Sequence, residues 1–206
     1  MPHIPTTLTA ELSVMPFYDA LSESEKSTEY DVSRWLYVPS RYDEYRYILG
    51  TRGNNPLIAV GVNPSTAAPD ALDNTLKSVE RIALGNGYDS FIMFNVYAQR
   101  ATNPDDMEKE LNVTLHRENM TAFDYALSLS HSPAVWAAWG TVIEKRAYLA
   151  DCVRDMIETG NKRGARWFTC GKRSKKHAHP HHPLYLKKDA ALEEFDAAEY
   201  LDNLKK

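Results

Sequence analysis

The stretch 57-LIAVGVNPSTAA-68 decides the fold of this chain. Its first six residues are apolar or small without a polar break, which is typical of a strand buried on both faces of a parallel sheet. The strand ends in Asn63-Pro64-Ser65-Thr66, a polar turn with a carboxamide at its tip. In open α/β sheets, ligands bind beside the carboxyl ends of the strands. Asn63 is therefore the first candidate for a functional side chain, although Asn-Pro-Ser is also good turn chemistry on its own.

Strand-like and helix-like segments alternate along the chain around this stretch. Three more buried strands are predicted, at residues 90–96, 133–140 and 165–171. Helical spacing or composition covers residues 72–87, about 106–129, 141–160 and 189–206. Such alternation predicts an α/β fold with three layers, in which helices cover both faces of a central, mostly parallel four-stranded sheet.

The N-terminal part of the chain is less regular. Two strand-like runs flank Pro39-Ser40 and predict a hairpin, "VSRWLYV" at 32–38 and "YDEYRYIL" at 42–49. Residues 1–30 are weakly periodic, so we expect an N-terminal arm, followed by a single α/β domain over residues 31–206.

Composition excludes several classes of protein. Of the 206 residues, 43% are hydrophobic and 25% are charged, as in an ordinary globular protein. No apolar run approaches the roughly 20 residues that a membrane span needs. The N-terminus lacks a basic region followed by an apolar stretch, so we expect no signal peptide. Two cysteines, Cys152 and Cys170, are too few for a disulfide scaffold, and we expect a cytoplasmic protein.

Positive charge is concentrated near the C-terminus. The net charge is −4, yet residues 161–188 contain nine Lys or Arg residues and no Asp or Glu. Such a segment suits contacts with nucleic-acid phosphates or forms a solvated basic loop. The candidates for backbone contacts in its loop are Lys172, Arg173, Lys175 and Lys176. The run "HAHPHH" at 177–182, with Cys170, could also be read as a zinc site, but its spacing matches no zinc motif.

Polar and aromatic residues follow each predicted strand. Asn95 closes the second strand and leads into Tyr97 and Arg100, and Trp139-Gly140 closes the third. Since parallel strands end at one edge of a sheet, these residues should converge on one crevice. Asp73 lies a few residues beyond the first strand, and Arg100 could either bind a phosphate or pair with Asp73.

The order of these motifs resembles a known family. The core "NPSTA…DNT…GNGYDSFIMFNVYAQRAT…AAWG…HHPLYL", over roughly residues 34–188, is similar to the bacterial and phage family called domain of unknown function 1643. The same stations also resemble those of the uracil-DNA glycosylase superfamily. That resemblance implies a uracil-DNA glycosylase-like fold, with Asn63 positioning water, Asn95 reading the edge of a base and His182 facing the leaving base.

Two departures from that superfamily bear on the substrate. Its uracil-specific members carry a bulky Tyr where this chain has Ser65, so a pyrimidine with a larger 5-substituent could fit here. The expected stacking Phe is replaced by Asp73-Asn74-Thr75, which leaves Tyr97 or Trp139 to stack on the base.

We therefore expect a DNA glycosylase, acting in phage defence or in repair, that hydrolyses the N-glycosidic bond of a modified or damaged base and leaves an abasic site. Asn63 and His182 are the expected catalytic residues. The expected substrate-binding residues are Ser65, Asp73, Asn95, Tyr97, Arg100 and Trp139. The expected partner is single- or double-stranded DNA, bound by a monomer without metal or cofactor. Two alternatives remain open, a hydrolase of free nucleosides or nucleotides and a module that binds a modified base without cleaving it.

Overall fold

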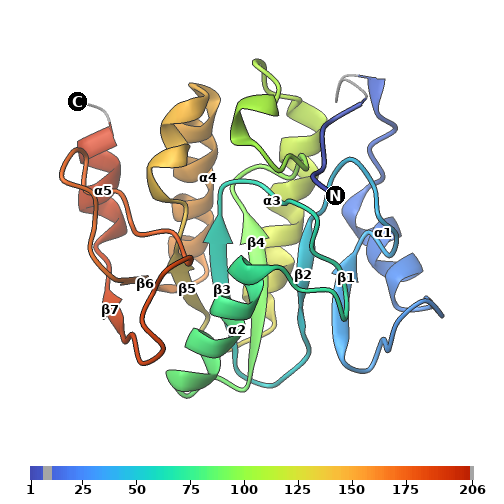
Figure 1. Ribbon diagram of the computed structural model, residues 1–206, viewed down its shortest axis with the longest axis horizontal. Coiled ribbons are helices and arrows are strands. Elements are labelled where there is room, and N and C mark those ends of the chain that lie inside the picture. The colour runs from blue at the N-terminus through green and yellow to red at the C-terminus, as the bar shows by residue number, and fades with distance from the viewer. Residues whose placement is uncertain (7–10, 205–206) are drawn as a thin grey trace.

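A computed structural model of the protein describes residues 1–6 and 11–204. Within these residues the chain forms one mixed sheet of seven strands, in the order β1-β2-β4-β3-β5-β6-β7 (Figure 1). The strands are β1 (Trp35–Val38), β2 (Ile48–Thr51), β3 (Pro56–Gly61), β4 (Ser90–Asn95), β5 (Ala134–Ala137), β6 (Arg166–Cys170) and β7 (Leu192–Glu194). The fold class is α/β, as predicted.

The sheet is larger than the four strands expected from the sequence. β3 pairs in parallel with β4 and β5, and β5 pairs in parallel with β6. The β1–β2 hairpin extends this sheet, because β2 pairs antiparallel with β4. At the other edge β7 pairs antiparallel with β6. Both additions give hydrogen-bond partners to the backbone of strands that would otherwise be edges.

Strand β7 lies in a segment that we expected to be helical, residues 189–206. Leu192–Glu194 has good helix formers, but pairing with β6 overrides their intrinsic preference. The final helix begins only after Asp196, whose Oδ1 accepts a hydrogen bond from the Glu199 amide at 2.8 Å. The predicted helix is therefore shortened to α5, Ala197–Leu204.

The other helices are α1 (Phe17–Ser24), α2 (Asn74–Gly85), α3 (Val113–Ser128) and α4 (Tyr148–Lys162). Three begin later than the sequence predicted, and α2 does so by only two residues. Asn112 caps α3 by accepting from the Leu115 amide, and residues 140–145 form a 3-10 helix before α4. No helix in the part of the chain that is described is both long and apolar enough to cross a membrane.

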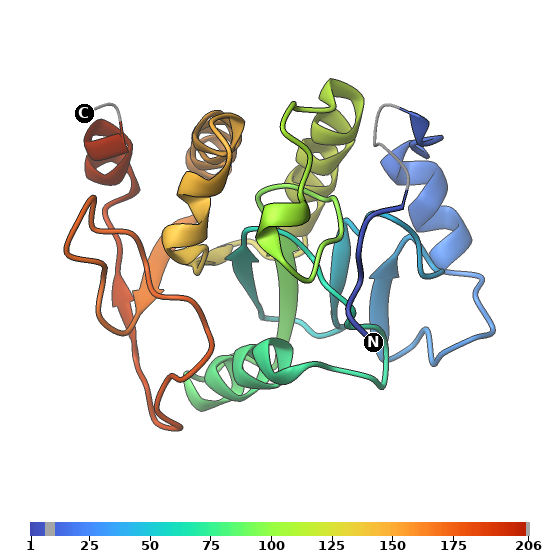
Figure 2. The same cartoon turned by 45° about the horizontal axis from the view of Figure 1, so that its top comes forward.

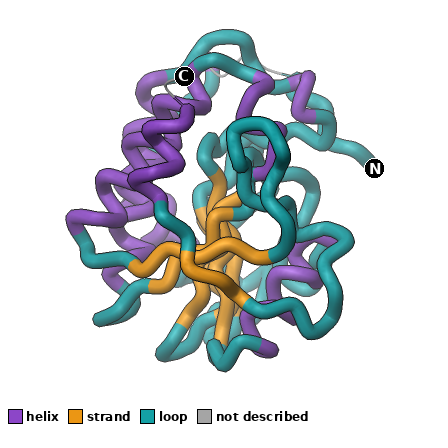
Figure 3. The backbone as a smooth tube through the Cα atoms, turned by 90° about the vertical axis from the view of Figure 1, so that its left-hand side faces the viewer, coloured by secondary structure: helices purple, strands orange, loops and turns teal. Residues whose placement is uncertain are grey.

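Helices cover the two faces of the sheet unequally. Helices α1, α3, α4 and α5 lie on one face, whereas α2 is the one α-helix of the described chain on the other, beside the loop that follows β6 (Figure 2). An end-on view shows the same asymmetry (Figure 3). The predicted arm at residues 1–30 includes α1, whose Phe17 is buried against Tyr47 and Tyr125. Positions 7–10 of that arm, and 205–206 of the predicted domain, lie outside the described residues.

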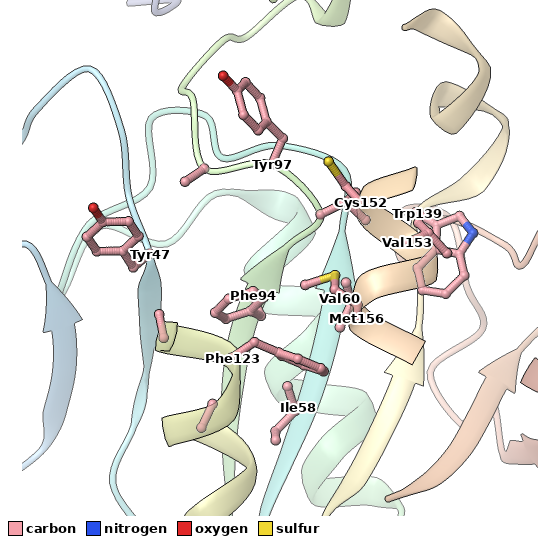
Figure 4. Close-up of a cluster of buried hydrophobic side chains, with 14 of the residues drawn as sticks. Tyr47, Ile58, Val60, Phe94, Tyr97, Phe123, Trp139, Cys152, Val153 and Met156 are labelled. Carbon is pink, nitrogen blue, oxygen red and sulfur yellow. The ribbon is translucent and has the colours of Figure 1, made fainter. Parts of the chain in front are cut away.

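Alternate residues of β3 face opposite sides of the sheet. Ile58 and Val60 belong to the larger apolar cluster, under α3 and α4, which includes Phe94 and Phe123 (Figure 4). Leu57 and Ala59 belong to the smaller cluster under α2. This alternation, which is inherent in a β-strand, continues to the end of β3 and determines which side of the sheet the side chains at its end face.

Candidate functional site

A cavity of about 230 Å³ lies at the carboxyl ends of β3 and β4, beside the beginning of α2. Six of the residues predicted for the site line it: Asn63, Ser65, Asp73, Asn95, Trp139 and His182. They come from the turn after β3, the N-cap of α2, the ends of β4 and β5, and the loop after β6. The structure therefore brings together residues up to 119 positions apart in sequence, from Asn63 to His182.

Strand geometry places the two carboxamides on the same side. Gly61 is paired with Asn95, and it continues the alternate positions of β3 that face α2. A Cβ atom on Gly61 would lie 2.6 Å from Met93 Cε and 3.2 Å from the Asn95 side chain. A side chain here would crowd both Met93 and the Asn95 carboxamide, which is consistent with the glycine in an otherwise apolar strand.

Asn63 is held by hydrogen bonds from its nitrogen. Nδ2 donates to the carbonyl oxygens of Ala101, at 2.7 Å, and Pro64, at 3.1 Å. These bonds fix the orientation of the carboxamide, because only the nitrogen can donate. Oδ1 is thereby left as an acceptor, the atom that could hold a water molecule or a donor on a ligand.

Asn95 is almost completely buried, with 1% of its surface exposed. Hydrogen bonding assigns its orientation: Nδ2 donates to the main-chain oxygens of Phe94 and Asn63, at 3.3 and 3.2 Å. The Asn119 side chain supports this position by donating to the Asn95 carbonyl at 3.0 Å. Asn95 therefore connects the end of β4 to the turn after β3 and presents its oxygen as the remaining polar atom.

His182 comes from the loop that follows β6. The Leu184 amide donates to its Nδ1 at 3.3 Å, so the hydrogen of the neutral imidazole sits on Nε2. Burial, and next the neighbouring His181, lower the pKa of His182, while Asp73 acts in the opposite direction. At neutral pH the side chain is thus an uncharged imidazole that can donate from Nε2.

The loop carrying His182 approaches two other elements closely. Gly140 has a φ of +62°, and a Cβ there would lie 3.4 Å from His182 Cβ. On the other side, the buried Ser78 hydroxyl of α2 donates to the Pro183 carbonyl at 2.8 Å. Gly140 in the Trp-Gly turn leaves room for the His-Pro turn. Ser78 on α2 fixes the position of that turn through its hydrogen bond.

Asp73 and Ser65 lie half-buried at the cavity wall. Asp73 is the N-cap of α2, and its Oδ1 accepts from the Leu76 amide at 2.9 Å. The Ser65 hydroxyl bonds to the Thr102 hydroxyl at 2.9 Å, and Thr102 also bonds to the main chain of His3. Asp73 is the only carboxylate among the residues that line this cavity.

Arg100 has a structural position that differs from both sequence-based expectations. Its side chain is fully buried and does not line the cavity. Instead of pairing with Asp73 or facing a phosphate, it donates to the carbonyls of Ser65 and Ala67 and to the Tyr37 hydroxyl. Arg100 therefore supports the turn after β3 from the side that faces away from the cavity.

The two aromatic residues expected to stack on a base are core residues (Figure 4). Tyr97 is fully buried away from the cavity, packed against Tyr148. Trp139 borders the cavity, but its indole is buried and donates from Nε1 to the Tyr200 hydroxyl at 2.9 Å. Both rings are buried, so neither offers an open face to a base in this structure, and Tyr97 does not line the cavity.

The basic residues of the loop after β6 do not line the cavity either. Lys172, Lys175 and Lys176 are exposed. Arg173 lies over the ring of Phe195, 5.0 Å from its centroid, and so packs at the far edge of the sheet. Any contact of these side chains with a nucleic acid would be made outside the cavity.

Arg46 lines the cavity and was missed from the sequence. It precedes β2, is 1% exposed, and its Nη1 donates to the Ala67 carbonyl at 3.1 Å. The available signal was an arginine inside the strand-like run 42–49, but nothing in that run indicated that the hairpin would join the sheet beside β4.

The two cysteines and His179 do not line the cavity. Burial raises the pKa of Cys152 to about 12 and that of Cys170 to about 11. The His179 ring bonds to the Tyr200 hydroxyl at 2.8 Å and to Glu144 at 3.0 Å. No group of three or more metal-ligating side chains occurs within residues 1–6 and 11–204.

The sequence matches the family described as "Protein of unknown function (DUF1643)" over residues 46–184. The chain belongs to the DUF1643 family. No curated protein and no solved structure matches it.

The cavity of this DUF1643 protein is lined entirely by residues within the matched part of the sequence. The residues that line the cavity run from Arg46 to Leu184, which are also the first and last matched positions. A larger groove, of about 550 Å³, is lined mainly by the loop 105–110 with Arg146. It does not collect residues from the strand ends, so the smaller cavity is the better candidate for the functional site.

Proposed function

We propose that this DUF1643 protein hydrolyses the N-glycosidic bond of a modified nucleotide, as a DNA glycosylase would. The observation that carries the proposal is the meeting of Asn63, Asn95 and His182 in one cavity. It also rests on the resemblance of their motifs to those of the uracil-DNA glycosylase superfamily. A cavity of about 230 Å³ is below the usual range for drug-sized ligands, and its size suits a single base.

Breaking this bond needs stabilisation of opposite charges on the two fragments. Positive charge develops on the sugar, and negative charge develops on the departing base. Asn63 Oδ1 can accept from a water molecule that attacks the anomeric carbon, since Nδ2 is already used. The Asp73 carboxylate can stabilise the cationic sugar, and Nε2 of His182 can donate to the oxygen of the leaving base.

Recognition of the base would fall to the inner wall. The Asn95 carboxamide is buried and oriented by main-chain carbonyls, which suits it to one fixed hydrogen bond with a base edge. Ser65 leaves more room at the mouth than a bulky aromatic residue would, so a 5-substituted pyrimidine is the proposed class of base. Tyr185, which follows cavity residue Leu184 and is 97% exposed, is an aromatic surface available to neighbouring bases.

One observation favours the alternative in which the substrate is a free nucleotide. The exposed lysines of the basic loop do not line the cavity, whereas one buried arginine does. A mononucleotide would bring its charge into the cavity, and a DNA strand would keep its phosphates outside. The salt dependence of binding separates the two, because it steepens with each phosphate contacted.

The decisive experiment is to measure release of free base by mass spectrometry and abasic sites in the same samples. Oligonucleotides would carry uracil, hydroxymethyluracil, hydroxymethylcytosine or a glucosylated base. Asn63→Ala and His182→Phe should each reduce release by about 100-fold or more. Asn161→Ala is the matched control, because that carboxamide bonds to Trp167 and lies outside the cavity.

Each result has a clear consequence. Release by the wild type and by Asn161→Ala, but not by Asn63→Ala, would establish the glycosylase and name its base. Tight binding of one base without release would support the non-catalytic module. Neither release nor binding with any DNA would remove the DNA glycosylase proposal.

A further inference from the structure

Arg46 is a buried cation with unused hydrogen-bonding capacity. It lines the cavity while only 1% of its surface is exposed. One of its hydrogen bonds is accounted for, from Nη1 to the Ala67 carbonyl at 3.1 Å. Its Nε is buried without a partner, and no ion pair within the described chain involves this side chain.

A second buried arginine adds to the positive charge. Arg100 lies close enough that its charge, after burial, lowers the pKa of Arg46. An arginine nonetheless stays protonated near neutral pH. The charge of the Asp73 carboxylate raises the pKa of Arg46. Asp73 is already engaged as the N-cap of α2. Among the residues that line the cavity, Asp73 is thus the one carboxylate available to Arg46, whereas the charge of Asp43 acts on Arg100.

Buried charges in proteins are normally paired, because an unpaired charge loses its hydration without compensation. Arg100 partly meets this requirement, since its two Nη atoms donate to protein oxygens. Within the described chain the Nε of each arginine has no partner, but Arg46 donates through Nη1 alone, and Arg46 is the one of the two that borders the cavity. The missing partner is therefore expected to be supplied by a ligand.

We propose that Arg46 binds an oxyanion, a phosphate or carboxylate group, of the ligand that occupies the cavity. The planar guanidinium suits this role, because its fork of N–H groups matches the two oxygens of such an anion. The first turn of α2 borders the same space through Asp73, Thr75 and Leu76, and the helix dipole adds positive potential there.

The substrate class follows if the proposed function holds, and this step rests on it. The nucleotide would carry an oxyanion inside the cavity in addition to, or instead of, the phosphodiesters of a DNA strand. The substrate would be either a nucleoside monophosphate or a nucleotide whose base has a carboxylate substituent. Both present the same group to Arg46, and experiment distinguishes them.

Calorimetry with inorganic phosphate and with acetate tests the site itself. The full chain should bind at least one of them at millimolar concentration, and Arg46→Gln should weaken this binding by about tenfold or more, as expected for a charged hydrogen bond. Arg81→Gln is the matched control. Arg81 also has a buried Nε without a partner but does not line the cavity, so its loss should leave binding unchanged.

A second variant protects the test if Arg46→Gln fails to fold. Asp73→Asn keeps a good N-cap residue and removes the carboxylate that competes with the anion. It should tighten phosphate or acetate binding, by about threefold for a nearby charge. Unchanged binding in Arg46→Gln, or in Asp73→Asn if Arg46→Gln does not fold, would overturn the proposal, as would no binding of either anion by the wild type.

Failure of this inference can be told apart from failure of the proposed function. Asn63→Ala should abolish base release and leave phosphate binding intact. Anion binding through Arg46 without base release from any substrate would keep the subsite and remove the glycosylase. Base release that is equal in the wild type and Arg46→Gln would keep the glycosylase and remove the anion subsite. Nucleoside 5′-monophosphates and oligonucleotides with 5-carboxycytosine, compared as competitors of the bound anion, identify its source.

Discussion

The two faces of the sheet are built differently. Four helices cover one face, where a continuous apolar cluster joins α1, α3, α4 and α5 to the strands. The other face has α2 and the loop after β6, and its apolar cluster is smaller. Buried polar residues occur on helices of both faces, with Ser24 on α1, Asn119 on α3 and Ser78 on α2. Most of the apolar packing therefore lies on one side of the sheet, whereas α2 and the loop after β6 bring Asp73 and His182 to the cavity at the strand ends from the other, thinly covered side.

The largest expected effect follows from breaking the thickly covered face. Phe123 of α3 is fully buried, with its ring 5.1 Å from that of Phe94. Phe123→Ala removes this packing and leaves a cavity, so the free energy of unfolding should fall by about 3–5 kcal/mol. Urea denaturation of the purified variant measures the change.

Val113→Ala is the matched control, because Val113 begins the same helix and is 70% exposed. Its free energy of unfolding should change by less than about 0.5 kcal/mol. If Phe123→Ala cost no more than this control, the larger cluster would not be the main source of stability and the contrast between the faces would be lost.

The sequence predicted the fold class because its signals are local. Continuous apolar runs such as 57–62 and 91–94 are recognisable without tertiary context. The size of the sheet was not recognisable, since the hairpin and Leu192–Glu194 become part of it only by pairing with β4 and β6. Distant pairing leaves no pattern in a short stretch of chain.

A smaller effect is expected from the residue that supports the turn after β3. Arg100→Leu removes this donor from the part-buried Ser65 carbonyl and leaves Arg46 as the donor to the Ala67 carbonyl, which should lower the free energy of unfolding by about 1–3 kcal/mol. The turn should also loosen. Hydrogen exchange of the Ala101 amide, which donates to Pro64 O at 2.9 Å, should accelerate more than global destabilisation explains.

Arg117→Leu serves as the comparison for Arg100→Leu, because Arg117 is an exposed arginine on α3. It should alter neither stability nor the exchange of Ala101. Unchanged exchange in Arg100→Leu would show that the turn after β3 holds its shape without Arg100, and that the thin face is more rigid than we infer.

The candidate site was predictable to the extent that strand ends mark it. Asn63, Asn95 and His182 follow from motif order, and the structure brings them together. Tyr97, Arg100 and Trp139 occur in the same motifs yet point into the protein, because alternation and helix packing decide the direction of a side chain. Arg46 reaches the cavity from a different strand pair, and its role depends on pairing that the sequence does not encode locally.

The smallest expected effect is the pH dependence that His182 gives the thin face. Burial and His181 lower its pKa in the folded chain below the ordinary 6.5. The unfolded chain therefore binds this proton more readily, so the stabilising contribution of neutral His182 is complete above about pH 6.5 and is lost as the pH falls through the folded pKa. His182→Gln should flatten the dependence of the free energy of unfolding on pH on the acid side of this value. The exposed His131→Gln, outside the cavity, should keep the wild-type slope. If both variants kept the wild-type slope, the His182 side chain would be accessible to water in the folded chain. The cavity would then lack the water-excluded surroundings that a donor to a leaving base requires.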